Sequence, residues 1–590
     1  MARAPNTLGN NLFGNARVPT YTQASSVKAY TLTADTRFNA LLQADPAYRL
    51  AWSTQSGGKT AITYSFIWGG GVASQFAPGY GTEMTAATTG AVPSGEYANV
   101  ALAFQQWANV ANVTFKQVTE TAGGAVGDIR LGLSSRVGDS WGYTKLNAGG
   151  SANSYGDIWI NPLYGRDSYA VNTYNFTALM HEIGHGLGLA HPSEGNIIPT
   201  GYDYRNYTIM SYNDPPGAYA YNPAKEDFDY IIQTPMVYDI AAVQAIYGAN
   251  MSYHVGDNKY VYSPDSPFYA AIWDAGGHDM IDLRQFKHEC WVDLHPGAYS
   301  TLGFTNVSVS NNLGIAYNVT IEDCFGGAGN DTLVGNEANN RLYGNAGNDR
   351  LYGYGGNDKL SSGKGDDILS GGDGNDTFLA GSDTGNDRYV GGPGLDLVTY
   401  AGANSGVTVN LTTGVGDGTA AGLGKDTISG VERVTGSAHG DMLTGDANDN
   451  MLSGNGGDDT ITGMAGADTL RGGMGLDHLT GGSGADRFVF ERVAEFAGTT
   501  ATTCDVITDF KHAEGDLIVL SPIDANSQTT AQDAFTWIGT AAFHHVAGEL
   551  RYSSSGGNTL VQGDVNGDGQ PDFALLLLGS VPLAKGDFIL

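Results

Sequence analysis

Hydrophobic and polar positions follow two different periods along the chain. Residues 96–115, EYANVALAFQQWANVANVTF, place apolar side chains at helical spacing and then alternate like a strand. GDIRLGLSS (127–135) and YGDIWINP (155–162) alternate as strands do, and NFTALMHEIGHGLGL (175–189) predicts a helix with one apolar face. The first half therefore predicts a mixed helix-and-strand domain, preceded by a short helix around residues 34–50.

The second half repeats a nine-residue unit that begins with GGAGNDTLV at residue 326. Each unit has glycines at its turn, aspartate at the sixth place and a large apolar residue at the eighth. The frame slips by two residues within AGSDTGNDRYV (380–390), and the repeat resumes at residue 436 after LVTYAGANSGVTVNLTTG (397–414), which predicts strands outside the repeat. This pattern predicts a parallel β-roll whose eighth residues fill a narrow interior.

These patterns divide the chain into parts of different character. We expect a leader or pro-segment with an N-terminal helix (1–55), a mixed helix-and-strand domain that contains HEIGHGLGLAHP (56–255), a connecting β region (256–325), a first repeat block (326–396), spacer strands (397–435), a second repeat block (436–490) and a C-terminal β region (491–590).

Charge and cysteine content narrow the class of protein. Asp and Glu total 61 against 29 Lys and Arg, a formal charge of −32, which argues against nucleic acid or anionic lipid as partners and favours hard cations. No apolar run is long enough to insert into a membrane. Three cysteines are too few for a disulfide framework, and Cys290 and Cys324 are compatible with either a pair or buried thiols.

The aspartates at the sixth place of the repeat are expected to bind Ca²⁺, because carboxylates of successive turns would otherwise lie together without a counterion. These are Asp331, Asp349, Asp358, Asp367, Asp376, Asp441, Asp459, Asp468, Asp477 and Asp486. Asn340 and Asn450 replace the aspartate in one unit of each block, so we expect calcium positions there to be weak or missing.

Another acidic pattern, outside the repeat, occurs near the end of the sequence in DVNGDGQPD (564–572). Asp564, Asn566, Asp568 and Asp572 have the spacing of a calcium loop. The twelfth position is Leu575 and offers no bidentate carboxylate. The loop is therefore equally compatible with a calcium site and with a simple polar turn.

HEIGHGLGLAHP (181–192) has the spacing of a metal centre. His181 and His185 are four residues apart, so a helix projects both from one face. Gly188 allows the chain to turn, which would bring His191 to the same ion. Three imidazoles leave one position open for water, as in catalytic zinc sites, and Glu182 is placed to take a proton from that water. A surface helix with incidental histidines would not require this long spacing.

YTIMSY (207–212) follows this motif, and it supplies a methionine that we expect to lie beneath the metal, Met210. HEIGHGLGLAHP together with TIMSY resembles the serralysins, the calcium-dependent zinc endopeptidases among the metzincins. The resemblance extends to WANVANVTF, to PMVYDIAAVQAIYGAN and to IEDCFGGAGNDTLVGN. Gly186 departs from it, since that family usually has a small alanine there.

The resemblance implies an α+β metzincin catalytic domain followed by a calcium-binding parallel β-roll (RTX) and a C-terminal β-rich region. It implies that His181, His185 and His191 bind one Zn²⁺ and that Glu182 is the general base. Tyr212 matches an additional zinc ligand that swings away to stabilise the oxyanion. It also implies several structural Ca²⁺ ions.

The resemblance further implies a secreted, extracellular hydrolase that cleaves proteins or peptides. It also implies export from the cell by type I secretion. The final GDFIL is similar to the signal which that machinery reads. We expect a monomer. Substrate would pair with an edge strand, for which YGDIWIN (155–161), with Asp157 and Trp159, is a candidate, although it is equally compatible with the core.

A second hypothesis is a cell-surface or surface-layer RTX calcium-binding protein. Its protease domain would process the cell's own surface proteins or act as a binding module.

Overall fold

The computed structural model describes residues 27–29, 40–43, 50–69, 76, 80–121, 126–146, 155–193 and 198–590. The chain divides into two compact units, described separately below. Unit 1 contains residues 1–280 and 292–321, and unit 2 contains residues 281–291 and 322–590.

A mixed sheet forms the centre of unit 1. Its strands follow the order β3 (Gln55–Ser56), β4 (Lys59–Phe66), β7 (Ile129–Ser134), β9 (Ile158–Ile160) and β8 (Gly142–Thr144), with β5 (Thr89–Gly90) beside β7 and β6 (Val113–Gln117) beside β4. β8 pairs antiparallel with β9 and is the last strand of this order among the described residues. The helix-then-strand pattern of residues 96–115 is confirmed by α2 (Tyr97–Val110) and β6.

YGDIWIN (155–161) is not an edge strand, so the prediction that the substrate pairs with it is wrong. β9 lies between β7 and β8 and is paired with both of them, so its backbone has no open side. Asp157 and Trp159 are fully buried, and the Asp157 carboxylate accepts hydrogen bonds from the Tyr80 hydroxyl (2.5 Å) and the Arg130 backbone N–H (3.0 Å). The alternation in YGDIWIN thus reflects a central strand with both faces covered.

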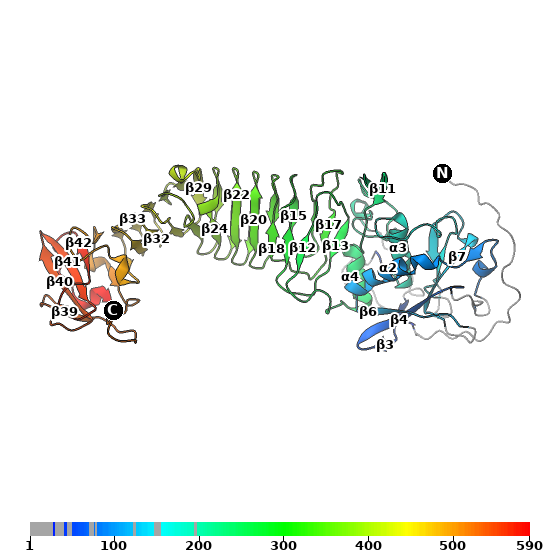
Figure 1. Ribbon diagram of the computed structural model, residues 1–590, viewed down its shortest axis with the longest axis horizontal. Coiled ribbons are helices and arrows are strands. Elements are labelled where there is room, and N and C mark those ends of the chain that lie inside the picture. The colour runs from blue at the N-terminus through cyan, green and yellow to red at the C-terminus, as the bar shows by residue number, and fades with distance from the viewer. Residues whose placement is uncertain are drawn as a thin grey trace. The chain divides into compact units, whose positions relative to one another are not determined.

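All the α-helices of the described residues belong to unit 1: α2, α3 (Tyr174–Gly186) and α4 (Val237–Tyr247) (Figure 1). Thr173 caps α3, since its hydroxyl oxygen accepts from the Phe176 N–H (3.2 Å). Indole N–H groups fix α3 from two sides: Trp107 donates to the Met180 carbonyl (3.1 Å) and Trp52 to the Gly186 carbonyl (2.9 Å). The chain therefore holds α3 at both its middle and its end.

The remaining elements of unit 1 are short. The helix expected over residues 34–50 lies largely outside the described residues. The strands are β1 (Val27–Ala29) paired with β2 (Leu50–Trp52), the hairpin β10 (Tyr219–Asn222) and β11 (Asp227–Tyr230), β12 (Lys259–Val261), and a small sheet of β13 (Ala270–Ile272), β17 (Leu313–Ile315) and β16 (Tyr299–Ser300). Strands β14 (Met280–Asp282) and β15 (Trp291–Asp293) contain the unit boundaries.

Unit 2 is built around a parallel β-roll of two sheets. Strands of one sheet pair in the order β18 (Asp323–Phe325), β20 (Arg341–Ala346), β22 (Lys359–Lys364), β24 (Thr377–Leu379), β26 (Leu397–Thr399), β30 (Arg433–Thr435), β32 (Met451–Gly456), β34 (Thr469–Met474), β36 (Arg487–Val489), β38 (Leu517–Val519) and β43 (Phe588–Ile589). Successive strands stand side by side in Figure 1.

The second sheet has strands β19 (Thr332–Val334), β21 (Arg350–Gly355), β23 (Ile368–Asp373), β25 (Arg388–Val390), β29 (Lys425–Ser429), β28 (Val415–Asp417), β27 (Thr408–Asn410), β31 (Met442–Thr444), β33 (Thr460–Ala465), β35 (His478–Ser483), β37 (Asp505–Ile507), β42 (Phe573–Leu577), β41 (Asn558–Asp564), β40 (Glu549–Ser555) and β39 (Thr536–Gly539). The C-terminal strands thus continue this sheet, partly in antiparallel pairing.

Eighth-position residues fill the interior of the roll, as predicted. Leu342 pairs with Leu360 and Leu351 with Leu369 in the register of one turn, and all four are fully buried. Residues 397–435 interrupt the repeat in sequence. The first sheet continues across them, because β26 pairs with β30 in parallel register, whereas in the second sheet the hairpin of β28 and β27 lies between β29 and β31. No helix among the described residues could span a membrane.

Candidate zinc and calcium sites

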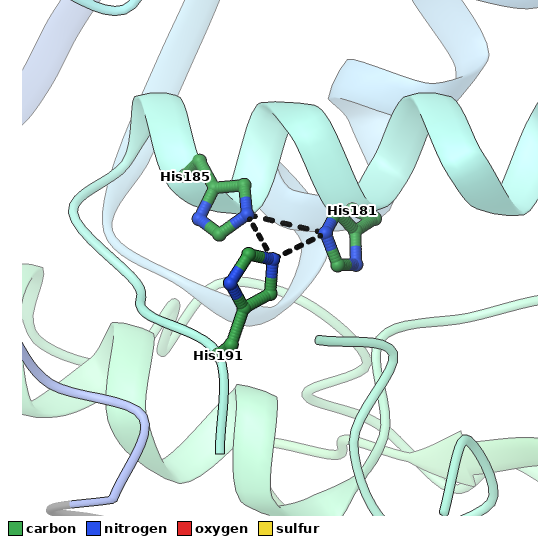
Figure 2. Close-up of side chains that lie close together, drawn as sticks. All are labelled: His181, His185 and His191. Carbon is green, nitrogen blue, oxygen red and sulfur yellow. Dashed lines mark hydrogen bonds between the residues drawn. The ribbon is translucent and has the colours of Figure 1, made fainter. Parts of the chain in front are cut away.

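Three imidazole nitrogens meet at the end of α3. The Nε2 atoms of His181, His185 and His191 lie 2.9–3.2 Å from one another (Figure 2). About 3.3 Å is the separation expected of nitrogens that each bind one tetrahedral zinc ion at 2.0–2.1 Å. Within the described residues this is the one group of three or more His, Cys, Asp or Glu with ligand atoms this close together. The three nitrogens therefore fit a single Zn²⁺.

The tautomers of two of these rings are set by the backbone. Nδ1 of His181 lies 2.8 Å from the Ile209 carbonyl and Nδ1 of His185 lies 2.9 Å from the Leu189 carbonyl. A proton on each Nδ1 leaves the Nε2 lone pair facing the other rings. Burial, together with the neighbouring imidazoles, lowers the pKa of both rings, that of His185 to about 3. Both rings are thus neutral, as a metal ligand must be.

Glycines allow this arrangement. Gly188 has a φ of 101°, the left-handed conformation that turns the chain after the helix and brings His191 back toward it. Gly184 faces Met210: a Cβ there would lie 2.8 Å from the Met210 sulfur and 3.0 Å from the Trp107 ring. The fully buried Met210 therefore packs directly against α3, and its place beneath a metal stays a prediction.

Glu182 is buried beside the three histidines, with 6% of its surface exposed. Its Oε2 accepts a hydrogen bond from the Thr144 hydroxyl at 2.8 Å. Burial raises the pKa of Glu182 to about 7. Thr144 belongs to β8, so the edge of the sheet and the carboxylate are linked directly. No local pattern indicates this contact, because Thr144 lies 38 residues from Glu182 in the chain.

Tyr212 contributes a phenol to the same centre. Its hydroxyl lies 2.6 Å from Nε2 of His191, and the side chain is 66% exposed. A group that touches the histidines while most of its surface faces solvent has room to move. The structure thus brings together the five residues predicted for this centre, His181, His185, His191, Glu182 and Tyr212. Their roles stay predictions.

Asp239 was missed by sequence reasoning. Its fully buried carboxylate accepts from the Thr208 hydroxyl (2.6 Å) and from the backbone N–H groups of Ile209 and Met236 (both 2.8 Å). Because the Ile209 carbonyl is the acceptor for His181, Asp239 positions the segment that orients a histidine. The residue lies in the apolar run PMVYDIAAV, where a lone carboxylate is itself a signal of a structural role.

A pocket of about 430 Å³ adjoins the centre. His181, Glu182 and Tyr212 form one part of its wall, and its other lining residues include Trp141, Gly142 and Arg205. Gly142 is the first residue of β8. The candidate centre is therefore open to molecules that lie along the edge of the sheet.

The aspartates of the repeat form two rows in unit 2. Oδ1 of each aspartate accepts from the backbone N–H of the corresponding residue one turn earlier, as between Asp331 and Asp349 (2.7 Å) and between Asp459 and Asp477 (2.9 Å). The other oxygen, Oδ2, has no hydrogen-bond partner in Asp349, Asp358, Asp367, Asp376, Asp459, Asp468, Asp477 and Asp486. These residues are almost completely buried.

Burial raises the pKa of these carboxyl groups: to about 7 for Asp349 and Asp358 and to about 8 for Asp459. A buried carboxylate oxygen without a donor is costly unless a cation or a proton neutralises it. Oxygen ligands are those that Ca²⁺ prefers. The rows therefore fit calcium, the metal predicted from the sequence.

The segment 564–572 forms a tight loop after β41. Both oxygens of Asp564 accept backbone hydrogen bonds, from Gly567 (2.6 Å) and Gly569 (2.8 Å), and Oδ2 of Asp572 accepts from Val565 (2.7 Å). Asp568 is exposed, and Asn566 donates to Asp572 (2.6 Å). Both interpretations of this loop stay open. The three cysteines are buried thiols, and no disulfide joins Cys290 to Cys324.

Known proteins match parts of this chain. Residues 238–414 match the family described as "Peptidase M10 serralysin C terminal", and segments within 426–488 match the RTX calcium-binding nonapeptide repeat. The resemblance to the serralysins is confirmed. The match to the serralysin family begins after the three histidines, so the zinc motif lies outside it.

Curated relatives agree with this resemblance. The chain is 35% identical over 263 residues to metallopeptidase AprA of Pseudomonas marginalis, covering 40% of this chain and 54% of the relative. It is 34% identical over 261 residues to serralysin C of Dickeya chrysanthemi, covering 40% of this chain and 52% of the relative. The chain spans about half the length of the serralysins it matches.

Among solved structures, a subunit of the mannuronan C5-epimerase of Azotobacter vinelandii is 30% identical and covers 27% of this chain and 91% of its own. Its TM-score is 0.21.

Proposed function

We propose that this chain is a secreted, calcium-dependent zinc endopeptidase of the serralysin type. The observation that supports this best is the convergence of three histidine nitrogens within 3.2 Å, beside a buried glutamate and at the end of a pocket. A metal with an open coordination position next to a carboxylate is the arrangement of hydrolytic zinc enzymes. Unit 1 would then be the α+β metzincin catalytic domain.

His181, His185 and His191 would hold the zinc through Nε2. When bound, zinc would polarise the scissile carbonyl and make a water molecule acidic enough to attack it near neutral pH. The protein's part is to keep the three rings neutral and fixed, which the Ile209 and Leu189 carbonyls do for His181 and His185.

Glu182 would act as the general base and then as the general acid. A carboxylate with a pKa near 7 is matched to proton transfer at neutral pH, and burial provides that shift here. Glu182 would take a proton from the attacking water and later give it to the leaving amine. The Thr144 hydroxyl bonds one oxygen and so orients the carboxylate for this task.

Tyr212 would stabilise the oxyanion. Its hydroxyl is close to His191 but its side chain is largely exposed, so a rotation could move the phenol toward a bound substrate. As a hydrogen-bond donor to the developing negative charge, it would act mainly on the rate of the chemical step.

The peptide substrate would lie along β8. Trp141 and Lys145 use their backbone groups to pair with β9, so alternation turns the N–H and carbonyl groups of Gly142 and Thr144 toward the open side. An extended peptide can add there by main-chain hydrogen bonds and reach the pocket beside Glu182.

Calcium would fold the roll after export, because the rows of buried carboxylates need a cation that is abundant outside the cell. Type I secretion and an extracellular location belong to this proposal. Proteins or peptides would be the substrates.

The test is casein zymography of the full chain at millimolar calcium, with and without a zinc chelator. Glu182→Gln is the test variant and Glu226→Gln the control, because Glu226 is exposed in a turn of unit 1 outside the described site. We expect clearing by the unmodified protein and by Glu226→Gln only, and none when zinc is removed. Failure of the zinc-loaded protein to clear casein would refute the enzyme and favour the surface-layer binding protein.

A further inference from the structure

The hairpin of β10 and β11 in unit 1 carries aromatic side chains on its exposed side. Tyr219 lies opposite Tyr230, and Tyr221 lies opposite Phe228. Alternation along the strands places these four rings on one side of the hairpin, which we call the aromatic face. Three of the rings are largely exposed: 49% for Tyr219, 48% for Tyr221 and 60% for Phe228. Ala220, on the opposite side, is buried. A half-buried hairpin normally turns its apolar side chains to the core, so this hairpin is inverted.

The rings of the aromatic face form two contacting pairs. The ring centroids of Tyr219 and Tyr230 are 4.9 Å apart, and those of Tyr221 and Phe228 are 5.5 Å apart. The second pair lies two residues further along the strands, a step of about 7 Å. Single exposed hydrophobic side chains are ordinary, but a group of neighbouring ones marks a surface that binds something.

The aromatic face begins at the wall of the pocket beside the histidines. Tyr174 lines that pocket, and its ring centroid lies 5.3 Å from that of Tyr230. Arg205 lines the same pocket, and its Nη1 donates a hydrogen bond to the Tyr230 hydroxyl (3.2 Å). Tyr230 thus contacts two residues of the pocket wall. The pairing of Tyr230 with Tyr219 then leads from the pocket to the exposed rings of the hairpin.

Arg205 also fixes the hairpin to YTIMSY (207–212). Its Nε donates to the Ser211 carbonyl (2.9 Å), and its Nη1 donates to Oδ1 of Asp214 (2.6 Å). The Tyr230 hydroxyl donates to the same Asp214 oxygen (2.5 Å). Charge-assisted hydrogen bonds of this kind are strong, so the base of the hairpin is held to the segment next to the histidines. A surface that is already fixed loses little conformational entropy when a chain binds to it.

The occupant that fits this face is the polypeptide substrate. An extended chain advances about 3.4 Å per residue, so the step between the two ring pairs corresponds to about two substrate residues. Tyrosine and phenylalanine rings offer a large contact area at a low cost in side-chain entropy, and they accept apolar and aromatic partners of many sequences. Folded proteins bury most such side chains, whereas unfolded and flexible chains expose them.

We propose that the aromatic face is a second binding surface for the substrate. It selects unfolded or flexible polypeptides that carry apolar or aromatic residues several positions from the cleaved bond. Tyr221 and Phe228 are the specificity-determining residues, since their pair is the one farther from the pocket wall. Glu226, in the turn of the hairpin, is not part of the face. This inference rests on the proposed peptidase function and adds a preference that a zinc centre alone does not provide.

The test uses the full chain, with calcium and zinc supplied, and three peptides that share one cleaved sequence. The short peptide ends next to that sequence. Two long peptides extend it by six residues at each end, one with Phe and Leu and the other with Ser and Gly. The test variant combines Tyr221→Thr with Phe228→Thr, because threonine favours strands. Val261→Thr is the matched control, since Val261 is an exposed residue of β12 in the same unit.

We expect the unmodified protein and Val261→Thr to prefer the apolar long peptide over the polar one by about tenfold in kcat/KM, as contacts with two aromatic rings provide. The double variant should lose this preference through a higher KM for the apolar peptide. Circular dichroism checks that the double variant is folded, and each single variant is measured if it is not. The proposal is overturned if the preference persists, or if kcat/KM falls equally for all three peptides.

Binding measurements separate this inference from the proposed function. Fluorescence anisotropy of labelled long peptides is measured with Glu182→Gln, alone and combined with the hairpin substitutions. We expect the apolar peptide to bind about tenfold more tightly than the polar one, and the hairpin substitutions to remove the difference. Absence of cleavage would refute the peptidase, whereas equal binding of both peptides would refute the aromatic face as a substrate surface. Sedimentation tests the other occupant: a dimer that the hairpin substitutions dissociate would assign the face to a second copy of the chain and overturn the proposal.

Discussion

The histidine site in unit 1 and the aspartate rows in unit 2 both gather metal-ligand side chains, but in opposite ways. The three histidine nitrogens meet at one point, and backbone carbonyls set two of the rings. Each aspartate row extends along the roll, and most of its aspartates leave one buried carboxylate oxygen without a hydrogen-bond donor. The backbone therefore holds the histidine rings in place, whereas the buried charge of the aspartate rows calls for cations to offset it.

Removing one histidine should abolish metal binding by the histidine site in unit 1. We expect His185→Ala to lose zinc and to lower kcat/KM by on the order of 10³ or more, since both polarisation and water activation are lost. Zinc content by mass spectrometry and peptide hydrolysis measure this. Calcium content should stay unchanged because the rows lie in the other unit. If His185→Ala kept its zinc and most of its activity, the three histidines would not bind one shared zinc ion.

Calcium removal should unfold the β-roll that carries the aspartate rows and leave the histidine site in unit 1 unchanged. Without the ion, buried carboxylates of successive turns repel one another once they ionise, so we expect the roll to lose its β signal in circular dichroism at pH 8. Zinc removal by a selective chelator is the matched control and should leave that signal in place. A roll that stays folded after exhaustive calcium removal would show that protons or packing suffice.

Tyr212 tests the contribution of a side chain in the histidine site that is not itself a histidine. Tyr212→Phe removes a hydroxyl 2.6 Å from His191 without removing a histidine. We expect kcat to fall by roughly 10²–10³ with little change in KM or zinc content, as for loss of one oxyanion donor. A change in KM alone would instead assign Tyr212 to substrate binding.

The pH dependence should reveal the charge of the rows. The pKa of Asp349 and Asp358 is raised from 3.8 to about 7, and that of Asp459 to about 8. Between these values the unfolded chain is ionised while the folded roll keeps its protons, so the calcium-free roll should lose stability as pH rises from about 4 to 8. Thermal unfolding of calcium-free protein at pH 5 to 8 tests the sign. A midpoint that rises with pH would be inconsistent with these shifts.

The smallest effect concerns the helix that bears two of the histidines. A Cβ on Gly186 would meet Ile129 Cδ1 at 3.4 Å and the Gly156 carbonyl at 3.5 Å, which is ordinary contact. We expect Gly186→Ala to stabilise unit 1 by about 0.5 kcal/mol through reduced chain entropy. Gly184→Ala, which meets Met210 and Trp107 at 2.8 and 3.0 Å, should destabilise it. Denaturation followed by tryptophan fluorescence compares the two.

Periodic patterns predicted the local structure well. α2, α3 and β7 follow hydrophobic periods, and the interior of the roll follows directly from the eighth position of the repeat. The meeting of the three histidines was also predictable, because a helical face and one left-handed glycine determine it. In each case the information lies within a few adjacent residues.

Features that depend on distant partners were not predictable. Thr144 and Asp239 contact the site from other strands and helices. The sequence left β9 equally compatible with an edge and with the core, because alternation does not reveal what lies on either side of a strand. Whether the second oxygen of a repeat aspartate has a hydrogen-bond donor, as in Asp331, or none, as in Asp349, depends on the fold of its turn, which the letters of the repeat do not encode.

The parallel pairing of β26 with β30 brings Leu397 opposite Arg433, although 36 residues separate them along the chain. The hairpin of β27 and β28 lies between β29 and β31 in the second sheet, where β28 pairs with β29 and β27 pairs with β31. A solenoid of this type can therefore accept a long insertion that adds two strands to one sheet while the other sheet continues directly. Counting motifs in the primary structure therefore underestimates how many coils the molecule has.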